Sequence, residues 1–357
     1  MRRTTKKVDI GGVVIGGGEP IAIQSMTNVS SQDKNALLGQ ISELEDAGCQ
    51  IVRIAIPDIE SAKTLAEVKK EAKLPIVADI HFDHRLAIEA ILAGADKIRI
   101  NPGNIGDIEN VRAVVKEAKA AGIPIRVGVN SGSLEKDILE KYSGVTAEGL
   151  AESAINNLKI IEDMDYDNLV VSLKSSDVVM NYEAHRILAE KTNHPIHIGV
   201  TEAGTIRRGK LKSAVGIGAL LLEGIGDTMR VSLTSSPVNE VLFAKELLET
   251  VGMRQSAYDL VSCPTCGRTK IDLESLAENV DEELSKIDGL KKGLKIAVMG
   301  CAVNGPGEAK GADYGIAGGD GKGIIFSKGE IIKSVSEDVL LEEFIELIKK
   351  EGIETNR

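Results

Sequence analysis

Short apolar runs and amphipathic stretches alternate along the first 250 residues of the chain. The apolar runs are rich in Val and Ile, as in strands buried on both faces, and each amphipathic stretch between them has the pattern of a surface helix. Eight strands are predicted, at residues 21–26, 50–56, 75–80, 96–100, 124–130, 168–174, 195–200 and 228–233.

This alternation predicts strands that pair in parallel through right-handed helical crossovers. Gly or Pro marks several helix-to-strand turns, as in AGCQIV, LPIV and GIPIRV. An open doubly wound sheet is one solution. We predict instead a closed (β/α)8 TIM-type barrel over residues 1–252, because eight such units close cleanly.

The pattern changes after residue 252. A strand-like YDLV, a charged helical stretch LESLAENVDEELSKI and a strand LKIAVMG follow, and the loop CAVNGPGEAKGADYG comes next. GKGIIFSKGEIIKSV predicts a hairpin that turns at SKGE, and SEDVLLEEFIELIKKEG predicts a terminal helix capped by Ser336. Residues 253–357 are therefore predicted to form a second, smaller α+β domain.

Composition and charge exclude several classes of protein. Hydrophobic residues make up 43% of the chain, which excludes global disorder. A net charge of −11, with four Phe, five Tyr and no Trp, argues against a dedicated nucleic-acid binder. The most apolar segment, AVGIGALLLEGIG, is too short to span a membrane, and the basic N-terminus lacks the apolar stretch of a secretory signal. We expect a cytoplasmic protein.

Several predicted strands carry a cation where a structural strand would carry Val or Ile. Each cation alone could be an ion-pair partner, but five that converge repel one another and are costly to bury without an anion. Functional groups of such barrels cluster where strands end, and Arg binds phosphate through two hydrogen bonds. We therefore predict a phosphate or diphosphate ligand. The five cations are Arg53, Arg99, Arg126, Lys174 and Arg230.

Other polar residues share these predicted strand ends. Asn130, Ser131, Ser172 and Ser232 are placed to complete a phosphate-binding cradle. The acids Asp79 and Glu202 would bind hydroxyls, handle protons or neutralise the arginines. His81 and His197 are the histidines closest to strand ends, and a lone histidine is more often structural than catalytic.

Three of the four cysteines lie in the second predicted domain. Cys263 and Cys266 form CPTCG, and Cys301 comes directly after a predicted strand. A CxxC can be a redox pair, half of a zinc site or part of an iron–sulfur site. Zinc ribbons usually supply a second CxxC, so we favour a [4Fe–4S] cluster held by three thiolates, with the fourth iron left for another ligand. Cys49, at a helix-to-strand turn, is expected in the core.

Both halves of the chain resemble one known family. CPTCGRT followed by MGCAVNGPGEA resembles the second domain of the 4-hydroxy-3-methylbut-2-en-1-yl diphosphate synthases, iron–sulfur enzymes of the non-mevalonate isoprenoid pathway. IVRIAIPD, VADIHFDHRLA, KIRINPGN, IRVGVNSGSL, VSLKSSD and HIGVTEAG resemble segments of its barrel, in the same order. The resemblance covers essentially the whole chain and is to the bacterial two-domain form.

The resemblance implies a role for each candidate residue. Cys263, Cys266, Cys301 and Glu308 would be the four ligands of one [4Fe–4S] cluster per chain. Arg53, Arg99, Arg126, Lys174, Arg230, Ser172 and Ser232 would bind the diphosphate. Asn130 and Glu202 would contact the hydroxylated carbon chain, Asn304 would contact substrate, and Glu308, Glu202 and Asn304 would take part in catalysis. The roles of Asp79, His81 and His197 are not implied.

The implied reaction is the two-electron reductive ring opening of 2-C-methyl-D-erythritol 2,4-cyclodiphosphate, with loss of water, to (E)-4-hydroxy-3-methylbut-2-enyl diphosphate. Reduced ferredoxin or flavodoxin would be the electron donor. The resemblance also implies a head-to-tail homodimer with shared active sites, and neither nucleic acid nor membrane as a partner. The competing hypothesis is a phosphate-binding barrel transferase, similar to a pterin synthase, with a structural zinc domain.

Overall fold

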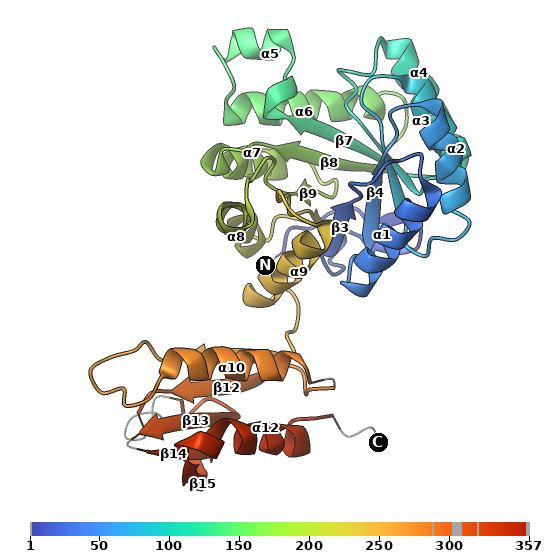
Figure 1. Cartoon of the computed structure of the whole chain (residues 1–357). Helices are drawn as coiled ribbons and strands as arrows, with labels where there is room; N and C mark the ends of the chain where they lie inside the picture. Colours follow the sequence, from blue (N-terminus) through green and yellow to red (C-terminus); the bar gives the residue numbers. More distant parts are fainter. Residues whose placement is uncertain (1, 288, 302–308, 320, 355–357) are drawn as a thin grey trace. The chain divides into compact units, whose positions relative to one another are not determined.

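The chain folds into two compact units, Met1–Arg254 and Gln255–Arg357, each with its own sheet and core. The computed structural model describes residues 2–287, 289–301, 309–319 and 321–354. Figure 1 shows the first unit as a set of strands with helices around it, and the second as a sheet with helices packed on it. No helix among the described residues is both long enough and apolar enough to cross a membrane.

The first unit is a parallel barrel. Its eight strands follow the order β8-β7-β6-β5-β4-β3-β10-β9, and every paired neighbour runs parallel. The ring is completed where Val171 N–H donates to Pro195 O at 3.0 Å, beside the bridge from Val171 to Ile196. The predicted (β/α)8 barrel is confirmed. The strands are β3 (Ala22–Met26), β4 (Ile51–Ala55), β5 (Ile76–Asp79), β6 (Lys97–Ile100), β7 (Ile125–Asn130), β8 (Leu169–Lys174), β9 (His197–Ile198) and β10 (Thr228–Met229).

Helices cover the outside of the barrel and bury their apolar faces against the strands. Five of them begin at an aspartate whose carboxylate accepts a hydrogen bond from a backbone N–H of the first turn, namely Asp33, Asp58, Asp83, Asp107 and Asp177. The helices are α1 (Lys34–Asp46), α2 (Ile59–Val68), α3 (His84–Leu92), α4 (Ile108–Ala121), α5 (Lys136–Lys141), α6 (Ala147–Glu162), α7 (Val178–Lys191), α8 (Ile206–Leu222) and α9 (Pro237–Thr250), with a 3-10 turn, η1 (Ser131–Ser133), after β7.

The last two barrel strands are shorter than the apolar runs predict. Arg230 N–H still donates to Ile198 O at 3.0 Å, and the backbone then leaves the ladder. Beyond it, Leu233 N–H donates to the Glu240 carboxylate at 2.8 Å and Thr234 N–H to Gly204 O at 2.9 Å. These bonds hold residues 230–233 as an ordered loop rather than a strand.

A hairpin that the sequence did not reveal closes the N-terminal end of the barrel. Strands β1 (Val8–Ile10) and β2 (Val13–Ile15) pair antiparallel. Their apolar side chains form a buried cluster with the first residues of several barrel strands. That cluster contains Val8, Ile10, Ile15, Ala22, Ile51, Val77 and Val170. The barrel is therefore apolar at its base, and the polar residues described below lie above that base.

The second unit is a five-stranded mixed sheet in the order β11-β12-β13-β14-β15. The first three strands run parallel and the last three antiparallel. Two neighbouring helices, α10 (Leu273–Ser285) and α12 (Leu340–Glu351), pack on the sheet, and an α+β domain is confirmed. The strands are β11 (Tyr258–Ser262), β12 (Leu294–Met299), β13 (Tyr314–Gly319), β14 (Lys322–Ser327) and β15 (Glu330–Ser336), followed by a 3-10 turn, η2 (Glu337–Val339).

Two details of this unit differ from the sequence-based expectation. The start of β13 was expected in a loop. Its glycines hide the strand pattern, and a Cβ at Gly315 would lie 2.3 Å from the Phe326 ring, so the position cannot carry a typical strand side chain. Ser336 does not cap the terminal helix. It precedes the 3-10 turn without a side-chain capping bond, and α12 begins at Leu340.

Candidate active site

The five predicted cations lie together in one pocket at the C-terminal ends of the barrel strands, where barrels of this kind carry their functional residues. The pocket has a volume of about 180 Å³. The lining residues are Met26, Arg53, Asp79, His81, Arg99, Arg126, Asn130, Ser172, Lys174, Thr201, Arg230 and Ser232. The structure therefore brings together most of the barrel residues that the sequence singled out.

Strand register explains this convergence. Arg99 and Arg126 are direct neighbours in parallel register, as are Asp79 and Arg99. Side chains alternate between the two faces of a strand, and the isoleucines on either side of Arg99 pack outward against the helices. The arginine therefore points into the barrel.

Asp79 is the central carboxylate of the pocket. It accepts a hydrogen bond from Arg99 Nη1 at 3.2 Å, and its other oxygen lies 3.7 Å from Arg53 Nε and 3.3 Å from His81 Nε2. Burial by itself would raise the pKa of Asp79, but Arg53, His81 and Arg99 together hold that pKa far below its usual value. Asp79 is thus a fixed negative charge that orients two arginines rather than a proton donor.

Two further cations lack such a partner. Arg126 is 1% exposed, and its Nε and Nη1 have no hydrogen-bond partner among the described residues. Burial lowers the pKa of the Lys174 amine well below its usual value, and the charges of Arg230 and Arg53 lower it further. Buried cations without partners are costly, so this pocket favours an anionic ligand that carries several hydrogen-bond acceptors.

Two glycines make room for the cations. A Cβ at Gly128 would lie 2.5 Å from Arg99 Nε, and a Cβ at Gly199 would lie 2.9 Å from Lys174 Nζ. A side chain at either position would clash with the neighbouring cation unless that cation moved, and at Gly199 it would also lie 2.6 Å from Arg230 O. The two glycines lie in the motifs VGVN and HIGV, but their role was not recognised from the sequence.

Three other participants were missed by sequence reasoning. Met26 Sδ lies 2.8 Å from Arg53 Nη2, and Thr201 lines the pocket. Glu240, on α9, lies 3.9 Å from Arg230 Nε. Met26 and Thr201 carried no signal beyond their predicted strands or loops, and Glu240 lies on a helix, so its approach to the pocket depends on tertiary packing.

Some predicted site residues lie elsewhere. Ser131 and Glu202 are not among the lining residues, although Glu202 follows Thr201 in the chain and is exposed, with a left-handed backbone (φ 50°).

His197 is fully buried in the barrel, where Nδ1 lies 2.8 Å from Thr228 Oγ1. Asn304 and Glu308 lie outside the described residues.

The cysteines of the second unit lie at one edge of its sheet. Strands β11 and β12 are parallel neighbours, with Ser262 opposite Val298. Cys263 follows the first strand, and Cys301 follows the second after one glycine. Gly300 N–H donates to Cys263 Sγ at 3.2 Å, so the two strand ends are in direct contact. The sequence placed these thiols 38 positions apart, and the sheet makes them neighbours.

The third thiol belongs to the loop after β11. Cys266 is exposed, and a backbone hydrogen bond from Arg268, together with a bond from its side chain, lowers the pKa of the thiol. A thiol that ionises readily is a good metal ligand. All four cysteines are free thiols, and Cys49 is buried in the barrel core, where burial raises its pKa to about 11.

The donor set of this edge suits a thiophilic metal centre, since thiolates select zinc or iron–sulfur clusters. Among the described residues, however, no group of three or more His, Cys, Asp or Glu side chains is close enough to hold a metal ion. The described part of the chain thus supplies the thiols at one edge without a completed ligand shell.

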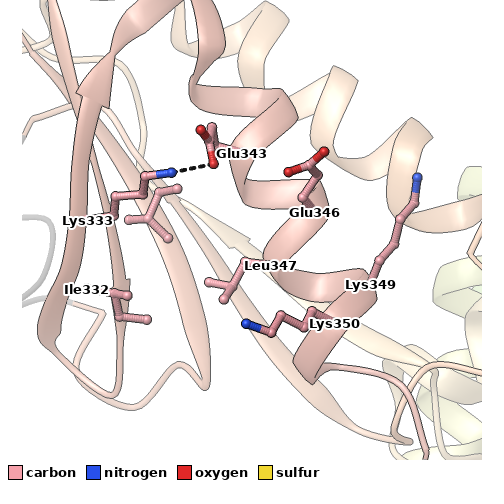
Figure 2. A pocket seen from close by; sticks show the side chains of 8 residues that line it. Ile332, Lys333, Glu343, Glu346, Leu347, Lys349 and Lys350 are labelled. Atoms are coloured by element: carbon pink, nitrogen blue, oxygen red, sulfur yellow. Dashed lines mark hydrogen bonds and ion pairs between the residues drawn. The ribbon is translucent and has the colours of Figure 1, made fainter.

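A larger pocket in the second unit has a different character. It has a volume of about 560 Å³ and lies between β15 and α12. Figure 2 shows Lys333 paired with Glu343 across it, at 2.6 Å, and a mixture of charged and apolar side chains around them. The charges of Lys333 and Glu343 compensate each other. The cationic barrel pocket is therefore the better candidate for the active site, despite its smaller volume.

Comparison with known proteins identifies relatives of both units. The profile of the GcpE TIM-barrel domain matches residues 5–245, and that of the GcpE protein C-terminal domain matches residues 259–350. The 4-hydroxy-3-methylbut-2-en-1-yl diphosphate synthase (flavodoxin) of Clostridium acetobutylicum is 55% identical over 344 residues, 96% of this chain and 98% of that protein. The protein of the same name from Bacillus subtilis is 53% identical over 350 residues, 98% of this chain and 91% of that protein.

Two solved structures each cover about 70% of this chain. A 3-dehydroquinate dehydratase from Geobacillus kaustophilus has a TM-score of 0.50 and 17% identity, covering 70% of this chain and 99% of its own. A 7,8-dihydropteroate synthase from Vibrio fischeri has a TM-score of 0.50 and 14% identity, covering 69% and 98%. At such low identity these matches show a shared fold and nothing about the reaction.

Proposed function

The chain belongs to the GcpE family, and we propose that its two units divide one reductive reaction between them. The barrel binds 2-C-methyl-D-erythritol 2,4-cyclodiphosphate, and the second unit carries the redox cofactor. The product is (E)-4-hydroxy-3-methylbut-2-enyl diphosphate. Family membership confirms the synthase that the motifs predicted, an oxidoreductase of isoprenoid biosynthesis, over the transferase with a zinc domain.

The observation that carries the barrel's role is its cationic pocket. Four arginines and one lysine line it, and Asp79 is its one lining carboxylate among the described residues. A diphosphate supplies the acceptor oxygens that Arg126 lacks and the negative charge that offsets the cations around Lys174. Ser172 and Ser232, which share the pocket, donate hydroxyl hydrogen bonds to the same oxygens.

The pocket also orients the carbon chain. Asp79 holds Arg53 and Arg99 in place before the substrate arrives, so little reorganisation accompanies binding. Asn130, at the end of β7, contacts the hydroxylated carbons from the pocket wall. Glu202 and Asn304 join it when the substrate is bound, and Glu202 and Glu308 act at the carbon–oxygen bonds that break.

The second unit supplies the electrons. Cys263, Cys266, Cys301 and Glu308 would hold one [4Fe–4S] cluster per chain, and the contact between Cys263 and Gly300 supports the proximity of Cys263 and Cys301. When bound, such a cluster transfers single electrons and offers one iron to a substrate oxygen. Two electrons enter the substrate, the ring opens at one carbon–oxygen bond, and a hydroxyl leaves with a proton as water.

The electron donor is a reduced flavodoxin or ferredoxin. The names of the relatives specify flavodoxin, which supports it as the first donor to test. The protein works in the cytoplasm, where four free thiols remain reduced.

The active site is shared within a head-to-tail homodimer, so that the barrel of one chain works with the second unit of its partner. The two sets of residues belong to separate units, each with its own core, and this supports such a division. Mixing Cys301→Ser chains with Arg230→Ala chains is expected to restore part of the activity, because one site of the mixed dimer is then intact. Complete inactivity of verified mixed dimers would contradict the shared site.

The function itself is tested by anaerobic turnover. Protein purified without oxygen is mixed with the cyclic diphosphate and chemically reduced flavodoxin, and the product is followed by mass spectrometry. We expect the open-chain diphosphate with two electrons consumed per molecule. Tight binding of the cyclic diphosphate without turnover by protein that holds its cluster would contradict the proposal.

A further inference from the structure

A lysine lies buried in the barrel beneath the diphosphate pocket. Lys97, the first residue of β6, is 0% exposed, and its Nζ has no hydrogen-bond partner among the described residues. It lies on the same strand face as Arg99, two residues further on, which lines the pocket. Its register partner Val77 belongs to the apolar cluster under the β1–β2 hairpin. Lys97 is thus one layer below the pocket and sealed from the opposite end.

The charged groups that face Lys97 are cations. Arg126 on β7 and Arg53 on β4 both act on its amine electrostatically. His197 on β9 is close enough to feel the charges of Lys97 and Arg126, and its Nε2 has no partner among the described residues.

The nearest carboxylates are committed elsewhere. Asp79 on β5 pairs with Arg99, Arg53 and His81. Asp96, the residue before Lys97, accepts from Ile76 N–H at 2.7 Å and pairs with Lys69. Glu240 faces Arg230. None of the described carboxylates pairs with Lys97.

We propose that Lys97 couples ligand binding to proton uptake: it is a neutral amine in the free protein and takes up a proton when a diphosphate fills the pocket above it. This inference rests on the proposed diphosphate site and adds a residue to it that contacts no substrate. Lys97 interacts electrostatically with Arg126 and Arg53 and does not contact the substrate. It is therefore a positioning residue rather than a catalytic residue.

The physical reason is charge compensation. Burial and the neighbouring arginines hold the pKa of Lys97 well below its usual value, so the free protein favours the neutral amine. A bound diphosphate offsets the repulsion from the arginines and raises the pKa of Lys97. The complex then holds one more proton than the free protein, and affinity must fall as the pH rises, by up to about tenfold per pH unit.

The test is calorimetric titration of the cluster-loaded, oxidised protein with the cyclic diphosphate, without electron donor, in buffers of different ionisation enthalpy at pH 8. Each phosphate of the ring lacks the second ionisation that phosphate monoesters show near pH 6, so the ligand does not change its own protonation. Wild-type protein is expected to take up close to one proton per ligand. Lys97→Met is expected to take up close to none and to show a flatter dependence of affinity on pH.

Lys69→Met is the matched control, because Lys69 lies outside the barrel and pairs with Asp96. It is expected to retain the wild-type proton uptake. Uptake near zero in the wild-type protein would overturn the inference even if Lys97→Met failed to fold. Uptake unchanged in Lys97→Met would also overturn it, and would assign the proton to Lys174 or His197. Failure of the wild-type protein to bind the ligand would instead sink the diphosphate site, and this inference with it.

Discussion

The barrel pocket and the cysteine edge of the second unit are organised in different ways. In the pocket four of the five cations lie on barrel strands, and Asp79 already bridges Arg53 and Arg99 without any ligand. At the cysteine edge, Cys263 contacts Gly300 beside Cys301, but Cys266 lies in an exposed loop and no ligand shell of three groups exists among the described residues.

The difference shows what each unit needs from its ligand. In the barrel, strand register positions the site residues, so the site is already formed before the ligand binds. The second unit supplies thiols at one edge, and the proposed metal centre would complete the arrangement, since metal binding contributes directly to folding energy. The barrel should therefore survive loss of the cofactor, whereas the loop around Cys266 should not remain ordered.

The strongest test of this difference between the two sites is the replacement of one proposed cluster ligand. Cys301→Ser is expected to abolish turnover, with a loss on the order of 10³-fold or more, and to leave binding of the cyclic diphosphate intact. Turnover is measured anaerobically, and ligand binding by calorimetry. Cys49→Ser is the control, because that thiol is buried in the barrel core and should cost stability but not activity. Loss of ligand binding in Cys301→Ser would show that the two sites are not independent.

The next change tests whether Asp79 preassembles the pocket. Asp79→Asn leaves buried arginines without compensation and is expected to lower the free energy of unfolding by about 3–5 kcal/mol at pH 7. Because the folded protein holds the pKa of Asp79 far below its unfolded value of about 3.9, this contribution is fully present above that pH and is lost progressively as the pH falls from there toward the folded-state pKa.

Denaturant unfolding between pH 3 and 7 provides the measurement. The gap between the two stability curves should be constant above about pH 5 and should begin to narrow as the pH falls below about 4. A constant gap between the curves at every pH would show that the carboxylate acts by packing and not by charge.

A smaller effect is expected for Arg126→Met. The side chain has two unpartnered nitrogens at the pocket, and charged hydrogen bonds contribute about 1.5–3 kcal/mol each, so KM should rise about 10²-fold while the cluster spectrum stays unchanged. Arg112→Gln, which removes an exposed pair with Glu109 on α4, should leave KM unchanged. An unaltered KM in Arg126→Met would remove Arg126 from the diphosphate site.

The smallest effects concern helix starts in the second unit. Asp272 accepts from Ser275 N–H and caps α10, so Asp272→Ala should cost about 1 kcal/mol. Ser336→Ala should stay within about 0.5 kcal/mol, because its side chain makes no capping bond. Thermal unfolding of both variants is the measurement. A larger loss for Ser336→Ala would contradict the observed start of α12.

The barrel was predictable from the sequence because its signals are local. Each Val- and Ile-rich run marks one strand, and each unexpected cation within a run marks one pocket residue, so Arg53 and Arg126 could be chosen without knowledge of the fold. Glu240 and Lys97 could not be chosen from the sequence. Glu240 reaches the site from a helix, and Lys97 looks like any lysine at the start of a strand until its burial is known.

The second unit was predictable in a different way. The CxxC motif predicted metal chemistry, but the contact between Cys263 and Gly300 depends on two distant strands that become neighbours. The hairpin from β14 to β15 was predicted, whereas β13 was missed because its glycines accommodate Phe326 and remove the strand pattern. Long-range pairing is the information that a local reading lacks.

The central claim is that the cysteine edge holds an iron–sulfur cluster while the barrel holds the diphosphate. Its most direct test is the iron, acid-labile sulfide and zinc content of anaerobically purified protein, together with the visible spectrum. We expect about four irons and four sulfides per chain with a brown charge-transfer band, and no such band in Cys263→Ser. One zinc per chain, without sulfide or colour after anaerobic reconstitution, would contradict the claim.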